Sequence, residues 1–250
     1  MTRFHVIALL ALPLAALALV SGHVLTGIAV LVALVVVMGF GVAFPQLRLF
    51  GPFICRGNAT RRCVALTFDD GPDARSTPAL LDLLRESVVA ATFFCVGERV
   101  AAHRELAARI VREGHRLENH SYTHSNTTNF FTVGKLKNEL TRAQTVIQEA
   151  TGVAPQLFRP PMGLSNPRVF RAAHALGLKV VGWTVRSFDT RIASPERIVQ
   201  RILRQLEPGA IILLHDGNIP AERLVLTVQS LLAKLREQDY AVVRLDKLLE

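Results

Sequence analysis

Charged residues are absent from the front of the chain, and acidic residues are the minority elsewhere. Between Phe4 and Leu47 the sequence contains no Asp, Glu, Lys or Arg, although 20% of all residues are charged. A run of this length raises the hydrophobic fraction to 50%, above what a water-exposed domain needs. Lys and Arg outnumber Asp and Glu by 29 to 20, which gives a net charge of +9. The sequence therefore predicts a basic, membrane-associated protein.

Cysteines are few, and nucleic-acid-binding motifs are missing. The three cysteines, Cys55, Cys63 and Cys95, do not have the spacing of a zinc site. Cys55 and Cys63 could form a disulfide in an oxidising compartment, whereas Cys95 ends an apolar run and is expected to be a buried thiol. The arginines are spread over amphipathic stretches, so we expect no nucleic-acid partner. Attraction to anionic lipid headgroups is the better use of this charge.

Two apolar segments, residues 5–20 and 24–44, are candidates for membrane spans, because a bilayer crossing takes about 20 residues. The first segment is short and contains Pro13, so a cleaved signal peptide is its rival. Arginines flank the pair on both outer sides and the connection is uncharged, which favours a hairpin in the cytoplasmic membrane with both ends in the cytoplasm. If only the second segment crosses, the rest of the chain is exported. The arginines after the second segment that could face anionic headgroups are Arg48, Arg56, Arg61 and Arg62.

We expect three parts in the chain: a transmembrane hairpin over residues 1–47, a linker over 48–62 and a catalytic domain over 63–250. In the third part, short apolar runs alternate with helical periodicity. The predicted strands are 63–68, 91–96, 115–119, 156–158, 179–183, 210–214 and 241–244, and the predicted helices are 77–87, 100–113, 133–150, 167–176, 195–206 and 221–238. This alternation fits a parallel sheet closed, or nearly closed, into a barrel, and an open doubly wound sheet would give the same pattern.

Residues with chemical reactivity follow the predicted strands, where barrel and doubly wound enzymes build their active sites. These residues are Asp69, Asp70, His120, Arg159, Asp189 and His215. The turn after Asp70 begins Gly-Pro and can bring both carboxylates toward one cleft. His120 and His124 are one helical turn apart, so they can share a face and bind one metal ion with Asp70. Such a set leaves positions open for water, as in hydrolysis by Zn²⁺ or another divalent metal.

Hydrolysis at such a site needs a base to take a proton from water and an acid to protonate the leaving group. Asp69, beside Asp70, is suited to be the base. His215 ends an apolar strand that would hold its imidazole at the rim of the cleft, which suits the acid. The structural alternatives are an Asx-type turn for the Asp pair and a capping histidine before a turn for His215.

Five segments, in order, resemble the five motifs of the polysaccharide deacetylases, also called family four carbohydrate esterases. They are residues 67–72, 120–124, 159–163, 183–189 and 213–216, and the resemblance spans residues 63–248. It implies a distorted, partly open (β/α)7-type barrel that removes an acyl group, normally acetyl, from an amino sugar with the help of a divalent metal. Zn²⁺ is the expected ion, with Co²⁺ and Ni²⁺ as alternatives.

The resemblance also implies a role for each site residue. Asp69 is the base and His215 the acid, while Arg159 and Asp189 orient them and tune their charge. The implied metal ligands are Asp70, His120 and His124. The implied substrate contacts are Pro161, Met162 and Trp183, with the backbone N–H of Met162 stabilising the oxyanion.

Two departures from the family pattern leave the acyl group open. Met162 stands where the family usually has tyrosine, and Thr190 where it commonly has tryptophan after the aspartate. The expected function is a membrane-anchored hydrolase of N-acylated amino sugars in an envelope glycan or a lipid-linked saccharide. The lipid-linked option has a precedent in the family's deformylase of lipid-linked aminoarabinose. The alternative is a carbohydrate-binding membrane protein without catalysis on the same fold. The oligomeric state is left open.

Overall fold

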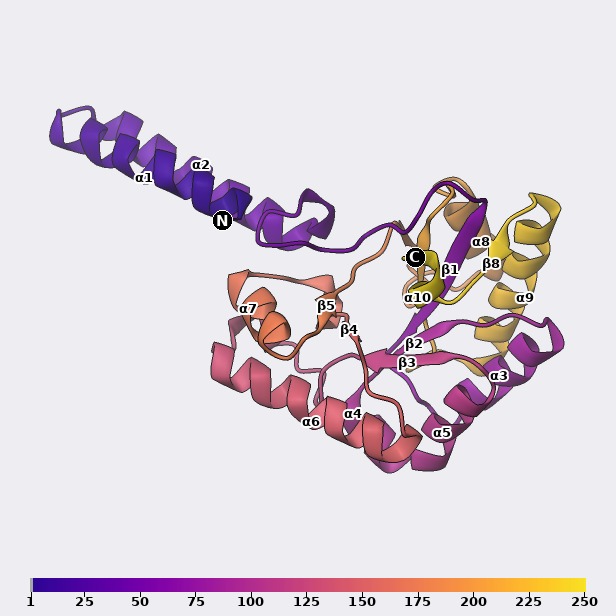
Figure 1. Ribbon diagram of the computed structural model, residues 1–250. Helices are drawn as coiled ribbons and strands as arrows, with labels where there is room; N and C mark the ends of the chain where they lie inside the picture. The colour runs from indigo at the N-terminus through magenta and orange to yellow at the C-terminus, as the bar shows by residue number, and fades with distance from the viewer. Residues whose placement is uncertain (1) are drawn as a thin grey trace.

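The computed structural model describes residues 2–250 and contains an apolar helical hairpin beside an α/β domain (Figure 1). Helices α1 (Arg3–Val20) and α2 (Val24–Ala43) pack side by side and project away from the domain. Their outward side chains are exposed and apolar, as at Leu10 (69% exposed) and Leu25 (85% exposed). Both helices are long and apolar enough to cross a membrane. Exposed apolar surface of this extent is typical of a face that contacts a membrane or another protein.

The domain is built on a curled parallel sheet in which every ladder is parallel. The order is β5 (Lys179–Val180), β4 (Leu157–Phe158), β3 (Arg116–Asn119), β2 (Thr92–Cys95), β1 (Cys63–Asp69), β7 (Ile211–His215) and β6 (Val185–Arg186), and β8 (Ala241–Val242) pairs with the start of β1. Neighbours follow the chain order around the sheet, as in a barrel, and do not reverse after the first strand as in a doubly wound sheet. The expected distorted, partly open barrel is confirmed, with its opening between β5 and β6.

Amphipathic helices cover the sheet. They are α3 (Thr77–Glu86), α4 (Gly97–Ala102), α5 (Arg104–Arg112), α6 (Val133–Thr151), α7 (Pro167–Ala175), α8 (Pro195–Leu203), α9 (Ala221–Glu237) and α10 (Leu245–Leu248), with 3-10 turns at Pro45–Leu47, Thr128–Phe130 and Pro161–Gly163. Helix α8 is an example: Ser194 caps its first turn. The helix buries Ile198 and Ile202 against the core, and its arginines face outward. The central strand β1 is buried along almost its whole length, so its end is held rigidly.

Two predicted elements differ from the structure, and one short strand was not predicted. The helix predicted at 100–113 is two helices, because the backbone leaves helical geometry at His103 (φ −132°). The strand predicted at 179–183 ends at Val180, and the short strand β6 follows it instead. A strand of two residues has no period to detect, so β6 left no signal in the sequence.

Residues 48–62, expected to be a linker, pack on the domain. Phe53 is 1% exposed, Ile54 forms a bridge with Val181 beside β5, and Arg56 forms a bridge with Ala210 before β7. The segment thus connects the two sides of the barrel opening.

The side chains around this segment also differ from what the sequence suggests. Arg56 forms an ion pair with Glu207 at 3.0 Å, and Arg62 lies over the ring of Tyr240, so both arginines have partners within the domain, and their contact with lipid headgroups stays a prediction. The three cysteines are free thiols, and Cys95 is buried as expected.

Candidate active site

Strand β1 delivers two carboxylates to one cleft. Asp69 is its last residue, and Asp70 adopts a left-handed backbone (φ 72°) that turns its side chain toward the same side. Asp69 Oδ2 and Asp70 Oδ1 lie 3.8 and 3.4 Å from His120 Nε2. A Cβ at Gly71 would lie 2.2 Å from Asp216 Oδ2, so the turn needs glycine here. The expectation that this turn joins the two carboxylates is confirmed.

His120 and His124 meet through a loop. The sequence suggested a shared helical face, but residues 120–124 are not helical, and that premise is wrong. Ser121 (φ 65°) and His124 (φ 50°) have left-handed backbones that fold the loop back on itself. The two ring centroids lie 4.9 Å apart. The loop backbone, and not a helical spacing, therefore brings the two imidazoles together, and their role as metal ligands stays a prediction.

Asp70, His120 and His124 form a group that can hold a metal ion, with one donor atom from each residue within 4.8 Å of the others. Asp70 Oδ1 lies 3.2 Å from His124 Nε2. Ligand atoms in a tetrahedral zinc site with bonds of about 2.1 Å are about 3.4 Å apart, so the spacing fits. His120 Nδ1 is hydrogen-bonded to the Arg159 carbonyl at 2.7 Å, which leaves Nε2 to face the group. The donor set thus fits a divalent cation in size and chemistry.

The electrostatics of this group favour positive charge between the side chains. Burial opposes ionisation of Asp70, but the hydrogen bond from His120 and the charges of His120 and His124 hold the pKa of Asp70 below its usual range. Burial and the neighbouring His120 lower the pKa of His124, which favours the neutral imidazole that binds metals. Burial also opposes the charge on His120, but Asp69 and Asp70 raise the pKa of His120. A buried pair of carboxylates thus attracts one cation to this position.

Arg159 anchors Asp69 from below. Its side chain is completely buried, and Nη1 donates to Asp69 Oδ1 at 2.7 Å and to Thr67 Oγ1 at 2.8 Å. Nη2 donates to the Gly182 carbonyl at 2.7 Å, and the guanidinium lies over the Phe94 ring. Burial lowers the pKa of Arg159, and the charge of Asp69 offsets that penalty. The pair leaves Asp69 Oδ2 turned toward His120, free to accept a proton.

Asp189 holds His215 on the other side of the cleft. His215 Nδ1 lies 2.8 Å from Asp189 Oδ1, and the His215 backbone N–H donates to Asp189 Oδ2 at 2.7 Å. The imidazole is 18% exposed, so Nε2 remains reachable. Burial opposes its charge, but the hydrogen bond and charge of Asp189, helped by Asp69 and Asp70, raise the pKa of His215 to about 9. His215 is thus protonated at neutral pH, as an acid must be.

The loop after β4 carries the expected substrate contacts. Met162 has a left-handed backbone (φ 57°) and a side chain exposed to solvent, whereas Pro161 is buried. Trp183 is 7% exposed and packs under the loop, since a Cβ on Gly163 would lie 2.0 Å from its indole. Trp183 therefore supports the loop from below, and contact of these residues with a sugar stays a prediction.

Three polar residues that the sequence analysis missed hold the site together. Asn119 Oδ1 accepts the Ser121 N–H at 2.8 Å, and Glu139 accepts both the N–H and the hydroxyl of Thr123 at 2.9 Å, so both shape the histidine loop. Asp216 accepts the Thr77 hydroxyl at 2.6 Å, and burial raises the pKa of Asp216 to about 7. A polar residue at the end of an apolar strand is the available signal, and it fits Asn119 and Asp216.

A cavity of about 250 Å³ opens beside the metal-binding group. Asp70 and His124 line it together with Arg99, Thr123 and Asn218. Arg99 Nη2 donates to Asn218 Oδ1 at 2.8 Å, which fixes the far wall. The exposed edges of Asp70 and His124 are therefore accessible to a small molecule from this side.

Comparisons with known proteins agree with this geometry. Residues 56–181, half of the chain, match the family described as "Polysaccharide deacetylase". The chain belongs to the polysaccharide deacetylase family. A peptidoglycan-N-acetylglucosamine deacetylase of Bacillus cereus is 35% identical over 190 residues, which cover 75% of this chain and 88% of the relative.

Other relatives differ in how much of them the chain covers. A chitooligosaccharide deacetylase of a Bradyrhizobium species is 38% identical over 64% of this chain and 74% of its own length. The chain spans only 39% of a peptidoglycan-N-acetylglucosamine deacetylase of Listeria monocytogenes, with 33% identity.

Among solved structures, a protein of Bacillus anthracis described as a CE4 family pseudoenzyme superposes with a TM-score of 0.74 and 30% identity, over 80% of this chain and 69% of the other. Since a pseudoenzyme shares the fold, the fold alone does not establish catalysis.

Proposed function

We propose that this polysaccharide deacetylase family member is a metal-dependent hydrolase that removes the N-acetyl group from an amino sugar in a glycan. The observation that carries the proposal is that a metal-binding group, a carboxylate oxygen of Asp69 and the imidazole of His215 lie at the ends of neighbouring strands, where Asp69 and His215 are register partners of β1 and β7. The Bacillus cereus and Bradyrhizobium relatives, named as deacetylases of peptidoglycan and chitooligosaccharide, support N-acetylglucosamine as the sugar.

The residues of the site suggest separate roles in the reaction. Asp70, His120 and His124 would hold a divalent cation, with Zn²⁺ expected from the two nitrogens and one oxygen. The chemistry supplied by a bound divalent cation is polarisation of the acyl carbonyl and a lowered pKa of water. Asp69 Oδ2 accepts the proton of the attacking water, since Oδ1 is already engaged by Arg159.

His215 completes the reaction on the opposite side. As the C–N bond breaks, His215 donates its proton to the departing amine, and acetate and the free amino sugar are the products. Asp189 keeps the imidazole oriented and charged until that step. The backbone N–H of Met162 is assigned to the oxyanion of the tetrahedral intermediate.

The alternative is a carbohydrate-binding protein without catalysis, for which the related pseudoenzyme is a precedent. The retained Asp69, Asp70, His120, His124 and His215 favour the enzyme.

The deciding experiment measures acetate release from N-acetylated chitooligosaccharide by the full-length protein in detergent, before and after chelation and after addition of Zn²⁺, Co²⁺ or Ni²⁺. We expect activity that chelation removes and metal restores. Sugar binding with no acetate release under any metal would support the binding protein instead.

We further propose that α1 and α2 anchor the domain in the cytoplasmic membrane as a hairpin, with the domain boundaries at residues 47 and 62. At the open end of the hairpin, the Phe4 N–H donates to the Leu49 carbonyl at 3.0 Å and Arg3 donates to the Leu47 carbonyl at 3.0 Å. These bonds join the N-terminus to the residues after α2, so both ends of a spanning hairpin are on one side. The flanking arginines favour the cytoplasm for that side.

Fusions to Glu250 test this orientation. We expect a fluorescent protein that folds only in the cytoplasm to be fluorescent and alkaline phosphatase, active only outside, to be inactive. Strong phosphatase activity without fluorescence would instead indicate export behind one span or a signal sequence.

A further inference from the structure

Five arginines gather around β6 and α8 without an acidic partner. Arg186 and Arg191 belong to the segment that leads from β6 toward α8, and Arg197, Arg201 and Arg204 lie on or directly after α8. Within residues 2–250 none of the five forms an ion pair within 4.0 Å. The acids nearest in sequence are engaged elsewhere, because Asp189 bonds His215 and Glu196 accepts from Ser194. The positive charge here is therefore uncompensated.

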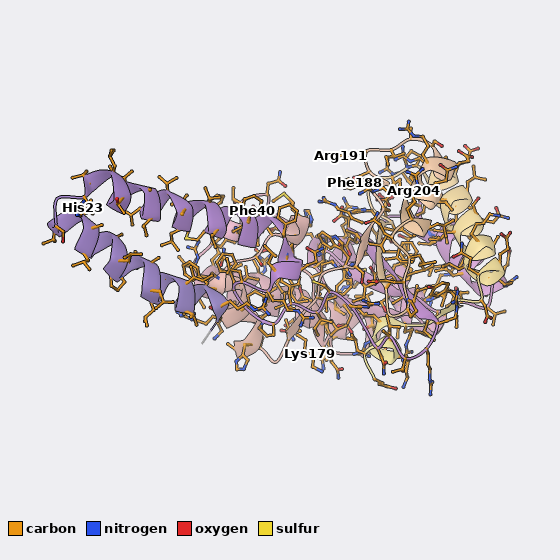
Figure 2. The ribbon with its side chains drawn as sticks, turned by 90° about the horizontal axis from the view of Figure 1, so that it is seen from above. His23, Phe40, Lys179, Phe188, Arg191 and Arg204 are labelled. Atoms are coloured by element: carbon orange, nitrogen blue, oxygen red, sulfur yellow. The ribbon has the colours of Figure 1, made fainter. Side chains whose placement is uncertain are left out.

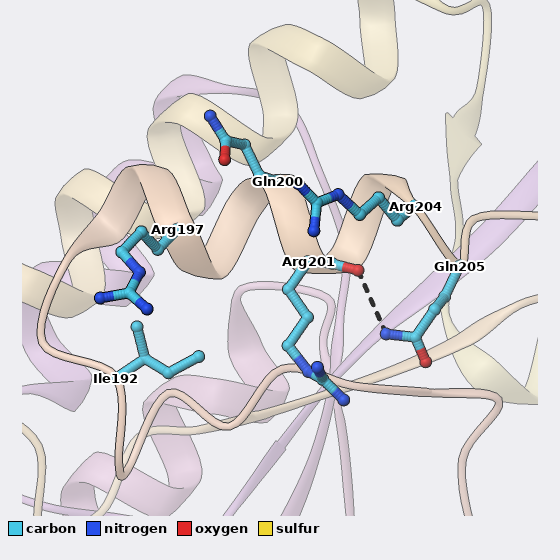
Figure 3. A pocket seen from close by; sticks show the side chains of 6 residues that line it. All are labelled: Ile192, Arg197, Gln200, Arg201, Arg204 and Gln205. Atoms are coloured by element: carbon cyan, nitrogen blue, oxygen red, sulfur yellow. Dashed lines mark hydrogen bonds between the residues drawn. The ribbon is translucent and has the colours of Figure 1, made fainter.

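Three of these arginines, those of α8 and its end, border a cavity of about 570 Å³ (Figure 3). We call this cavity the arginine pocket; its lining residues are Ile192, Arg197, Gln200, Arg201, Arg204 and Gln205. Figure 3 shows the guanidinium groups of Arg197 and Arg201 extending from α8 toward the segment that carries Ile192. The pocket thus lies between the helix and the segment that also carries Asp189.

Arg201 is held in place for binding. Its Nε donates to the Arg186 carbonyl at 3.0 Å, and its guanidinium lies 4.3 Å from the centre of the Phe188 ring. Arg186 lies over the same ring at 4.8 Å. None of the side-chain hydrogen bonds in the described chain uses the Nη atoms of Arg201. A guanidinium fixed at Nε with both Nη groups free loses little entropy on binding an anion.

The geometry of Phe188 and the repulsion among the arginines both have a cost. Phe188 adopts a left-handed backbone (φ 58°), which is unfavourable for a bulky residue. Burial lowers the pKa of Arg186, and repulsion from Arg191 and Arg201 lowers it further, while the charge of Asp189 raises it in part. A bound anion would turn that repulsion into attraction.

We propose that the arginine pocket binds a phosphate group carried by the glycan substrate, beside the sugar that is deacetylated. Guanidinium forks match phosphate oxygens, and three arginines without acidic partners around one cavity can supply them. Phe188, whose ring lies against Arg201, directly precedes Asp189, the partner of the proposed acid His215, so one segment connects the pocket to the leaving-group side. This inference rests on the proposed deacetylase function.

The position of the pocket favours a substrate phosphate over a lipid headgroup. Figure 2 shows Phe188, Arg191 and Arg204 on the domain, beyond Phe40 and away from the hairpin tip at His23. A bilayer that surrounds the hairpin would leave them in solution. An anionic bilayer surface is therefore an outcome of the test rather than the proposal.

The first measurement is direct binding of inorganic phosphate to the full-length protein by ³¹P NMR, with Arg197→Gln/Arg204→Gln as the variant. The matched control is Arg171→Gln/Arg236→Gln, which removes two exposed arginines from α7 and α9. We expect wild type and control to bind phosphate and the pocket variant to bind about tenfold more weakly or worse, the equivalent of one lost charged hydrogen bond. Equal binding by all three proteins overturns the proposal.

The second measurement compares deacetylation of N-acetylated chitopentaose with that of the same sugar bearing a phosphate on its reducing end. We expect the ratio of kcat/KM, phosphorylated over neutral, to fall about tenfold in the pocket variant and to be unchanged in the control. A ratio near one in wild type, or the same ratio in all proteins, overturns the substrate assignment. The substrate assignment is also overturned if the pocket variant loses binding to phosphatidylglycerol vesicles while its kcat/KM ratio stays unchanged. Absence of deacetylation with intact, arginine-dependent phosphate binding would refute the proposed function and not the site.

Discussion

The two sides of the candidate active site balance charge in opposite ways. Where β1, β3 and β4 end, each buried charge has a partner: Arg159 pairs with Asp69, and His120 and His124 face Asp70. Around β6 and α8, arginines gather at the surface with no acid to pair with them. A buried charge without a partner would destabilise the fold, whereas an exposed one costs little. The paired side is therefore built for chemistry within the protein, and the unpaired side for a charge that a ligand supplies.

On the paired side, removal of a metal ligand should have the largest effect on activity. His124→Ala should abolish both metal binding and turnover, because two ligands cannot hold the cation in place. Metal content by mass spectrometry and acetate release measure the two effects. His174→Ala, which removes an exposed imidazole from α7, is the control and should retain both. Full metal occupancy in His124→Ala would show that the ligand assignment is wrong.

Replacing each of the two adjacent carboxylates in turn distinguishes the proposed base, Asp69, from the proposed metal ligand, Asp70. Asp69→Asn should keep the metal and lose turnover by about 10² to 10⁴, whereas Asp70→Asn should lose the metal as well. Because Asp69→Asn leaves Arg159 buried beside a neutral group, unfolding free energy should fall by about 3–5 kcal/mol. Urea unfolding, metal analysis and kinetics on the same preparations measure these effects. Metal loss in a folded Asp69→Asn variant contradicts the division of roles.

Asp189 controls the pH range in which His215 can act. Burial lowers the pKa of His215, but Asp189, with smaller contributions from Asp69 and Asp70, raises it to about 9, so the imidazole is protonated below that pH and loses its proton above it. Asp189→Asn removes the raising charge, and the alkaline limb of kcat should move down by about 1–3 pH units. Asp82→Asn, which removes an exposed partner of Arg109, is the control and should leave the limb in place. An unmoved alkaline limb in Asp189→Asn would exclude His215 as the acid.

The sequence predicts the paired side better than the unpaired one, for a physical reason. Asp69, Asp70 and His215 end long apolar strands, so the local pattern places them at the rim of the barrel. The hydrogen bonds from Asn119 and Glu139 that fold the histidine loop join residues distant in sequence, and no periodicity encodes them. The position of the arginine pocket depends on the pairing of β6 with β7, which places residues 186–205 beside that strand. The strand β6 has only two residues and is too short to detect from the sequence.

The smallest expected effect concerns the loop that carries Met162, which belongs to neither side. Gly163 has a left-handed backbone (φ 68°), and a Cβ there would lie 2.0 Å from the Trp183 indole. Gly163→Ala should therefore lower unfolding free energy by about 1–3 kcal/mol. It should lower kcat as well as raise KM, because a shifted loop would misplace the Met162 N–H assigned to the oxyanion while Asp69 and His215 stay in place.

Gly134→Ala provides the matched control for that substitution. Gly134 lies in α6 with open space around its Cβ position, so alanine there should stabilise the protein by about 0.5–1 kcal/mol and leave KM unchanged. Thermal unfolding and Michaelis–Menten kinetics on both variants measure the contrast. If Gly163→Ala changes kcat and KM as little as Gly134→Ala does, then Trp183 and the Met162 loop do not position the sugar. Substrate recognition would then rest on the cleft beside His124 and on the arginine pocket.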